Sequence, residues 1–219
     1  MGFDQKVHEI IRINTHMRDF WADGGWAPRD AAQILSRSRL DWQVSLSHTL
    51  RLWLEPCKPD EAGGRLILGW ANLGALVEGT LKWFLCVYEA NYAAQAIKTK
   101  RGRAVGQPLD PDEPALGELI QFFQEHVWTP DQAQSWTPWL NHVRVRRNAI
   151  HAYQDRELGT CPELTDAIGR YRALLLELEG SVPYPDEYAY PADIAAMRSG
   201  ERFESPESAI TSPRRGGGR

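Results

Sequence analysis

Apolar residues recur at intervals of three and four along most of the chain, which is the spacing of one face of an α-helix. No segment alternates apolar and polar residues over enough positions to predict a β-strand. Glycine and proline separate the periodic segments, which predict helices over 4–20, 29–54, 65–97, 114–126, 138–158 and 162–178, with a short one over 191–198. The pattern therefore predicts an all-α fold.

Capping residues indicate where two of these helices begin. Pro138 suits a first helical position, where a backbone N–H would have no partner, and Thr137 suits the cap before it. Gly159 favours a stop for the same helix. Thr160 and Glu163 fit a capping box, in which each side chain accepts from the other residue's backbone N–H.

The segment 66–88 is long enough to cross a membrane, but Asn72, Glu78 and Lys82 lie inside it. A charged side chain at a bilayer centre costs about 2.5–3.5 kcal/mol, so we expect a buried central helix and no membrane contact. A lone buried carboxylate needs a cation. Glu78 is therefore predicted to form a structural ion pair, and Lys82 and Arg146 are both candidates for its partner.

Length and composition limit the domain organisation. The 219 residues, 42% hydrophobic and 25% charged, suffice for one ordinary core. We expect a single domain over 1–180 and a proline-rich, partly disordered tail over 181–219. Within that tail, Tyr184, Tyr188 and Tyr190 can pack back onto the helices.

Charge and cysteine content exclude several classes of protein. A formal net charge of −4 argues against a protein that coats nucleic acid with its whole surface, so RNA contact requires local basic patches. The first residues are amphipathic and interrupted by charge, unlike a signal peptide, and we expect a cytoplasmic protein. Cys57, Cys86 and Cys161 lack CxxC spacing, which suits reduced thiols better than disulfides or a zinc site. P-loop, Rossmann, zincin and hydrolase-elbow motifs are absent from the sequence.

The segment 144–153 gathers the groups that a metal-free ribonuclease needs. Three cations, an amide, an imidazole and a phenol follow one another within about three turns of the predicted helix. They are Arg144, Arg146, Arg147, Asn148, His151 and Tyr153. At 100° per residue, Arg144, Arg147 and His151 share one stripe, whereas Arg146 shares an apolar stripe with Tyr153.

This spacing resembles the Rx4–6H signature of the HEPN superfamily (higher eukaryotes and prokaryotes nucleotide-binding). Arg146 to His151 fits the four-residue register and continues to Tyr153 as RxxxxHxY, while Arg144 to His151 fits the six-residue limit. The residue after Arg146 is Arg147, and Asn148 comes one place later than in the commonest form of the motif. The helical order compatible with the family covers residues 65–180.

The resemblance implies a HEPN-like helical bundle with extra N-terminal helices and an irregular C-terminal tail. It also implies a homodimeric endoribonuclease of toxin–antitoxin or phage-defence systems, acting on RNA without metal or other cofactor. His151 would be the general acid or base, because imidazole titrates near neutral pH, and the arginines would stabilise the phosphate. Asn148 would orient the imidazole or bind a sugar hydroxyl. In the resembling toxins the tyrosine of RxxxxHxY is adenylylated by a nucleotidyltransferase antitoxin, which makes Tyr153 a candidate for modification.

Further residues are candidates for RNA contact. Lys98, Lys100, Arg101 and Arg103 begin a polar connection that would either grip the RNA backbone or form a solvated helix end. Trp128 and Trp136 precede the predicted motif helix, where they would either stack bases or pack in the core.

Two functions remain open. The first is the HEPN-type endoribonuclease. The second is a non-catalytic HEPN-like module that binds a nucleotide or a protein partner. In that case the arginines and His151 would serve recognition or dimer packing. A structural alternative for the motif is that Arg146 is held by Glu78, with Arg144 and Arg147 solvated.

Overall fold

The computed structural model describes residues 2–23, 27–99, 105–151 and 155–200, and within them the chain is helical and has no β-strand. The α-helices are α1 (Phe3–Trp21), α2 (Arg29–Arg37), α3 (Leu40–Thr49), α4 (Ala62–Val87), α5 (Glu89–Ala93), α6 (Leu116–Phe122), α7 (Pro130–Arg147), α8 (Cys161–Glu179) and α9 (Ala192–Ser199). Shorter turns are η1 (Leu50–Leu54), the π-helix η2 (Phe123–Val127) and η3 (Asn148–His151). The predicted all-α class is confirmed.

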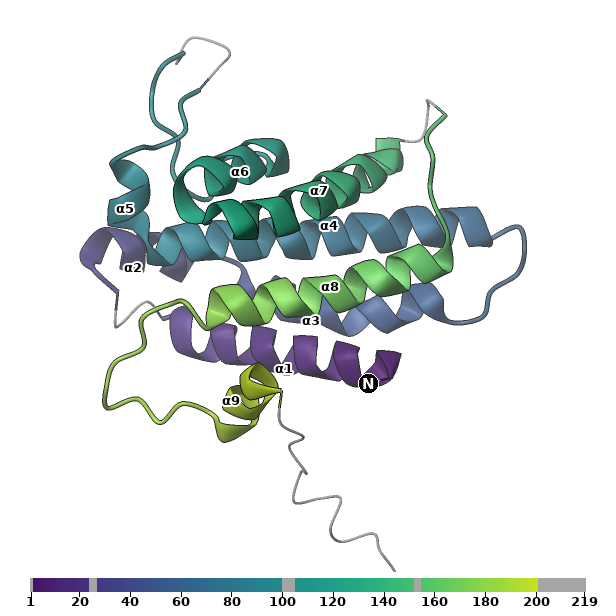
Figure 1. The fold of residues 1–219 in the computed structure, drawn as a ribbon, viewed down its shortest axis with the longest axis horizontal. Coiled ribbons are helices and arrows are strands. Elements are labelled where there is room, and N and C mark those ends of the chain that lie inside the picture. Colours follow the sequence, from purple (N-terminus) through teal and green to yellow (C-terminus); the bar gives the residue numbers. More distant parts are fainter. Residues whose placement is uncertain (1, 24–26, 100–104, 152–154, 201–219) are drawn as a thin grey trace, which may run out of the picture.

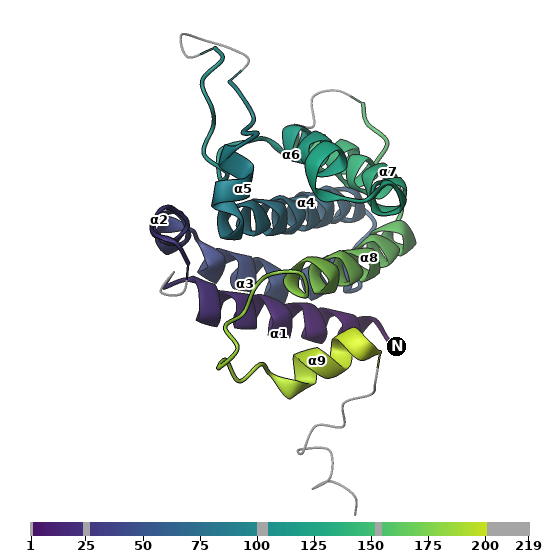
Figure 2. The ribbon, with the colours of Figure 1, turned by 60° about the vertical axis from the view of Figure 1, so that its left-hand side comes forward.

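Helix α4 lies at the centre of this bundle. It contacts α2, α3, α6, α7 and α8, while α1 packs against α3 and α8. Figures 1 and 2 show α6 and α7 together on one side of α4, with α8, α3 and α1 on the other and α9 beyond α1. The completely buried apolar residues of α4 recur at helical spacing: Trp70, Leu73, Leu76, Val77 and Leu81. Burying each such side chain contributes about 1.5–3 kcal/mol, so α4 anchors the layers on both sides.

Two predicted helices are shorter than expected. The segment 29–54 is divided at Ser38, whose backbone is extended and whose N–H and hydroxyl both donate to the Leu35 carbonyl. Serine competes in this way for the bonds that would continue a helix. The helix predicted to reach Ile97 ends at Val87, since Tyr88 leaves helical geometry and only the short α5 follows.

The motif helix begins eight residues earlier than predicted. Thr129 and Gln132 form a capping box and Pro130 occupies the first turn, so Pro138 lies inside α7 rather than at its start. The same helix ends at Arg147, well before Gly159, and the turn η3 carries the chain to His151. Gly159 has φ of +72°, a left-handed conformation that favours glycine, but it precedes α8 instead of ending α7.

The chain after α8 packs back onto the bundle. The predicted capping box of Thr160 and Glu163 is confirmed at the start of α8. Residues 181–199, which we call the C-terminal strap, cross α1 (Figure 2). The rings of Tyr184 and Tyr188 stack on His16 of that helix. The Tyr184 and Tyr188 rings lie 4.8 and 4.5 Å from the Phe20 ring, so the expected packing of the tyrosines is confirmed. Residues 201–219 lie outside the described part of the chain.

Candidate functional site

The last turn of α7 places its three arginines against three different neighbours. Arginines suit this position because positive charge stabilises the carboxyl end of a helix. However, the helix turns by 100° per residue, so adjacent side chains leave it in different directions. What each arginine can do therefore depends on the element that it faces.

Arg146 holds the segment after η3 against α7. It is 5% exposed, and its Nη2 lies 2.9 Å from Glu157 Oε1 and 3.8 Å from Glu163 Oε1. Hydrogen bonds from Thr160, together with the nearby Arg146 charge, keep the pKa of Glu163 below its ordinary value. The prediction that Arg146 pairs with Glu78 is wrong, since these two carboxylates occupy its guanidinium.

Glu78 is bound by Arg147 and Lys82 instead. Arg147 Nη1 donates to Glu78 Oε2, and Lys82 Nζ lies 2.9 Å from Oε1. Burial raises the pKa of Glu78, but the two cationic donors outweigh it and leave the pKa below its ordinary value. A Cβ on Gly74 would lie 2.6 Å from Arg147 Cδ, so glycine is what allows Arg147 to cross α4 closely. Glu78 thus forms the expected structural ion pairs. Its partners are Lys82, which was a candidate, and Arg147 in place of Arg146.

Arg144 has no ionic or hydrogen-bonded partner in the described part of the chain. Its guanidinium crosses α6, where Nη1 would lie 3.2 Å from a Cβ on Gly117. Its Nε is buried and unpaired. Of the three arginines, Arg144 is the one whose donors are not already given to a carboxylate.

His151 and Asn148 lie in the turn that follows. Asn148 caps α7, with its N–H donating to the Arg144 carbonyl. His151 is exposed, and none of its neighbours in the described chain hydrogen-bonds the ring. Val145 and Ile150, which flank the motif, are 52% and 48% exposed. The monomer therefore presents His151 to solvent beside apolar surface, and does not gather the arginines around it.

The remaining predicted RNA contacts are only partly described. Lys98 is exposed and pairs with Pro108 through an isolated antiparallel bridge. Lys100, Arg101, Arg103 and Tyr153 lie outside the described residues. Base stacking by Trp128 and Trp136 is contradicted, because both rings are buried and Trp136 Nε1 donates to Glu177 from within α7.

A stripe of polar residues on α7 was not predicted from the sequence. Gln134, Thr137, Asn141 and Arg144 recur at intervals of three and four, which places them on one face of the helix. This spacing could have predicted the stripe, but the helix was predicted to begin at Pro138, which left Gln134 and Thr137 outside it. The stripe faces α6 and η2, which pack along α7.

No described helix is both long and apolar enough to span a bilayer. Among the residues that the structure places, no group of three or more His, Cys, Asp or Glu side chains could hold a metal ion. Comparison of the chain with protein-family models, curated proteins and solved structures found no match.

Proposed function

We propose that this protein is a metal-independent, HEPN-type endoribonuclease in which His151 is the general acid or base. The observation that carries the proposal is an exposed imidazole in η3, the turn that directly follows α7 and Arg144, the arginine without a partner in the described chain. Arg144 supplies donors that suit phosphate oxygens as their charge grows. Because the motif resembles that of HEPN toxins and defence effectors, we infer that the protein acts as a toxin or a phage-defence effector.

The proposed reaction is attack by the RNA 2′-hydroxyl on the adjacent phosphorus. A base removes the 2′ proton as the new P–O bond forms, and an acid protonates the 5′ oxygen as its bond to phosphorus breaks. One imidazole performs one of these transfers, and His151 of a second copy performs the other. Arginine stays protonated and serves only to stabilise the pentacoordinate phosphate.

The exposed residues around His151 support a homodimer. Val145 and Ile150 are large apolar side chains at 52% and 48% exposure, and pairing the ends of α7 from two copies would bury them. Such pairing would also bring two sets of arginines to one cleft. A net charge of −4 makes this local concentration of positive charge necessary for RNA binding.

Replacing His151 with alanine tests the activity. We expect cleavage of a single-stranded RNA to fall about 100-fold or more, the usual effect of removing a general acid or base, with unchanged helicity. Cleavage rates are compared at matched protein concentration, and His48→Ala on α3 provides a histidine control. Full cleavage by a folded His151→Ala variant would contradict the enzymatic role.

Ile150→Asp tests the dimer. A carboxylate in a buried apolar interface is strongly unfavourable, so we expect the variant to be monomeric by light scattering and to lose cleavage together with the dimer. Leu52→Asp on η1 replaces another exposed leucine-sized side chain, at 39% exposure, and serves as the control. An unchanged oligomeric state in Ile150→Asp would rule out this interface.

A second function is favoured by the ion pairs of Arg146 and Arg147. Both guanidinium groups are bound by carboxylates of the same chain, as expected for structural residues. In that case the protein is a non-catalytic helical module that binds a nucleotide or a protein partner. It would then show no cleavage in the wild type, and His151→Ala would have no activity to remove.

A further inference from the structure

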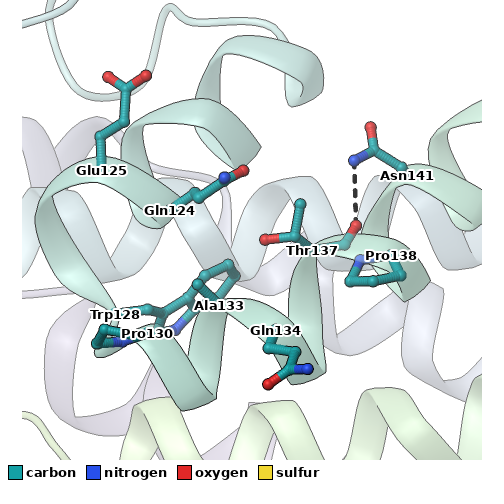
Figure 3. Close-up of a pocket in the computed structure, with 9 residues that line it drawn as sticks. All are labelled: Gln124, Glu125, Trp128, Pro130, Ala133, Gln134, Thr137, Pro138 and Asn141. Carbon is teal, nitrogen blue, oxygen red and sulfur yellow. Dashed lines mark hydrogen bonds between the residues drawn. The ribbon is translucent and has the colours of Figure 1, made fainter.

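An open groove of about 780 Å³ lies between η2 and the part of α7 from Pro130 to Asn141, and His151 lies beyond the other end of this helix. Figure 3 shows the Gln124 amide and the Thr137 hydroxyl pointing toward one another across the gap between the two helices. Asn141 Nδ2 donates to the Thr137 carbonyl at 3.1 Å, and its amide oxygen points away from α7 (Figure 3). The apolar part of the lining consists of Trp128, Pro130, Ala133 and Pro138.

Two buried polar atoms of this lining have no hydrogen-bond partner in the part of the chain that the structure describes. They are the Thr137 hydroxyl oxygen and the indole nitrogen of Trp128, a residue only 8% exposed. Buried polar groups are nearly always hydrogen-bonded, and an unpaired one calls for a specific explanation. Farther along the same stripe of α7, Arg144 Nε is also buried and unpaired.

Irregular backbone on both sides creates the groove. In η2 the Trp128 N–H donates to the Phe123 carbonyl five residues earlier, the π-helical pattern that is frequent at functional sites. On the other side, Pro138 inside α7 has no N–H, so the Gln134 carbonyl lacks its usual donor four residues on. The residues that line the groove thus include an unpaired indole donor, an unpaired hydroxyl and a backbone carbonyl without its usual helical donor.

The charge of the lining selects the ligand. Among the residues that the structure describes, no lysine or arginine lines the groove, and the charged residue that does is Glu125, which disfavours a phosphate or another anion. The lining instead carries three carboxamides, from Gln124, Gln134 and Asn141. A carboxamide presents a donor and an acceptor side by side, the pattern with which Asn and Gln bind the edges of nucleobases.

We propose that this groove binds an unpaired nucleobase, held edge-on by the Gln124 and Asn141 carboxamides and the Thr137 hydroxyl against the apolar floor. A planar heterocycle with donors and acceptors on its rim matches walls that present both kinds of group to one gap. A free nucleoside satisfies the same contacts as a base of single-stranded RNA. Thr137 lies 10 residues before the end of α7, about 15 Å along its axis, and His151 lies beyond that end, so the groove is separate from the motif and does not depend on cleavage.

Calorimetric titration of the full chain with adenosine, guanosine, cytidine, uridine and free ribose tests the proposal. We expect saturable binding of at least one nucleoside at one site per chain, and none of ribose. Thr137→Val removes the hydroxyl at equal shape and should weaken binding about tenfold, the loss of one hydrogen bond to a neutral group. Asn141→Ala should weaken it to a similar degree.

Two control variants test whether nucleoside binding depends on this groove and not on another part of the molecule. Thr165→Val makes the same substitution on α8, where the hydroxyl donates to the Cys161 carbonyl, and should leave binding unchanged. His151→Ala should also bind normally, whatever its effect on cleavage. The proposal is overturned if no nucleoside binds, if Thr137→Val and Asn141→Ala both bind as wild type does, or if binding is lost in His151→Ala.

Discussion

Replacing Glu179 with alanine is expected to lower the free energy of unfolding by about 3–5 kcal/mol, because breaking a buried ionic cluster leaves its other members unpaired. Glu179 lies at the end of α8 and is completely buried. The Tyr184 and Tyr190 hydroxyls donate to it at 2.8 and 2.6 Å, and His16 Nε2 lies 3.4 Å away. One carboxylate therefore connects α1, α8 and the C-terminal strap.

The strap should be the first part of the molecule to come loose in this variant. The rings of Tyr184 and Tyr188 stack on His16 at 5.4 and 5.9 Å, and Arg12 binds Asp193 of α9 at 2.6 Å. These contacts remain after the substitution, but the buried hydroxyls of the strap lose their acceptor. Faster hydrogen exchange in 183–199 than in α4, together with a lower urea midpoint, is the expected result.

The effect of pH follows from the charge of Glu179. Burial raises the pKa of Glu179, but His16, Tyr190 and Tyr184 lower it further and leave it below its ordinary value. The ionised group therefore stabilises the fold above the pKa of an unfolded glutamate, about 4.3, and this contribution is lost as the pH falls through the folded value. The stability difference between wild type and Glu179→Gln should narrow below about pH 4.

Asp166→Ala removes an exposed carboxylate from the same helix and should change stability by no more than about 0.5 kcal/mol. Equal urea midpoints for Glu179→Ala and Asp166→Ala would show that the buried cluster does not fasten the strap.

Local rules predicted the parts of the fold that depend on neighbouring residues. The capping box of Thr160 and Glu163 needs only side chains three residues apart, and the structure contains it. The path of α4 follows from its continuous apolar pattern. Pro138 was misplaced because proline is favourable in a first turn, and Pro130 with Thr129 satisfies the same rule eight residues earlier. Local sequence preferences therefore did not distinguish Pro130 from Pro138 as the first residue of this helix.

The partners of the arginines could not be predicted in the same way. Arg146 and Arg147 are adjacent, and which of them meets Glu78 depends on the rotation of α7 against α4. That rotation is set by long-range packing, including the close approach of Arg147 at Gly74. The fixed position of Arg146 likewise depends on Glu157, in a segment that was predicted to be helical. The unpaired state of Arg144 follows only from the positions of both neighbours.

Because the three arginines have different partners, we expect their substitutions to affect cleavage and stability differently. Arg144→Ala should reduce RNA cleavage about 10²–10³-fold, the usual effect of losing one donor to a developing oxyanion, with little change in melting temperature. Its side chain binds no carboxylate in the described chain, so removing it leaves no buried anion unpaired. Arg51→Ala, at an exposed position of η1, removes the same charge elsewhere and should leave cleavage unchanged.

Arg147→Ala should show the opposite balance. Glu78 would keep Lys82 but lose its second cationic donor, and we expect a loss of about 1–2 kcal/mol, or about 2–8 °C in melting temperature. Single-turnover cleavage rates and thermal unfolding of the three variants, measured on the same preparations, separate the two behaviours. If Arg147→Ala abolishes cleavage at an unchanged melting temperature while Arg144→Ala cleaves normally, then Arg147 binds the phosphate and its bond to Glu78 must open during the reaction.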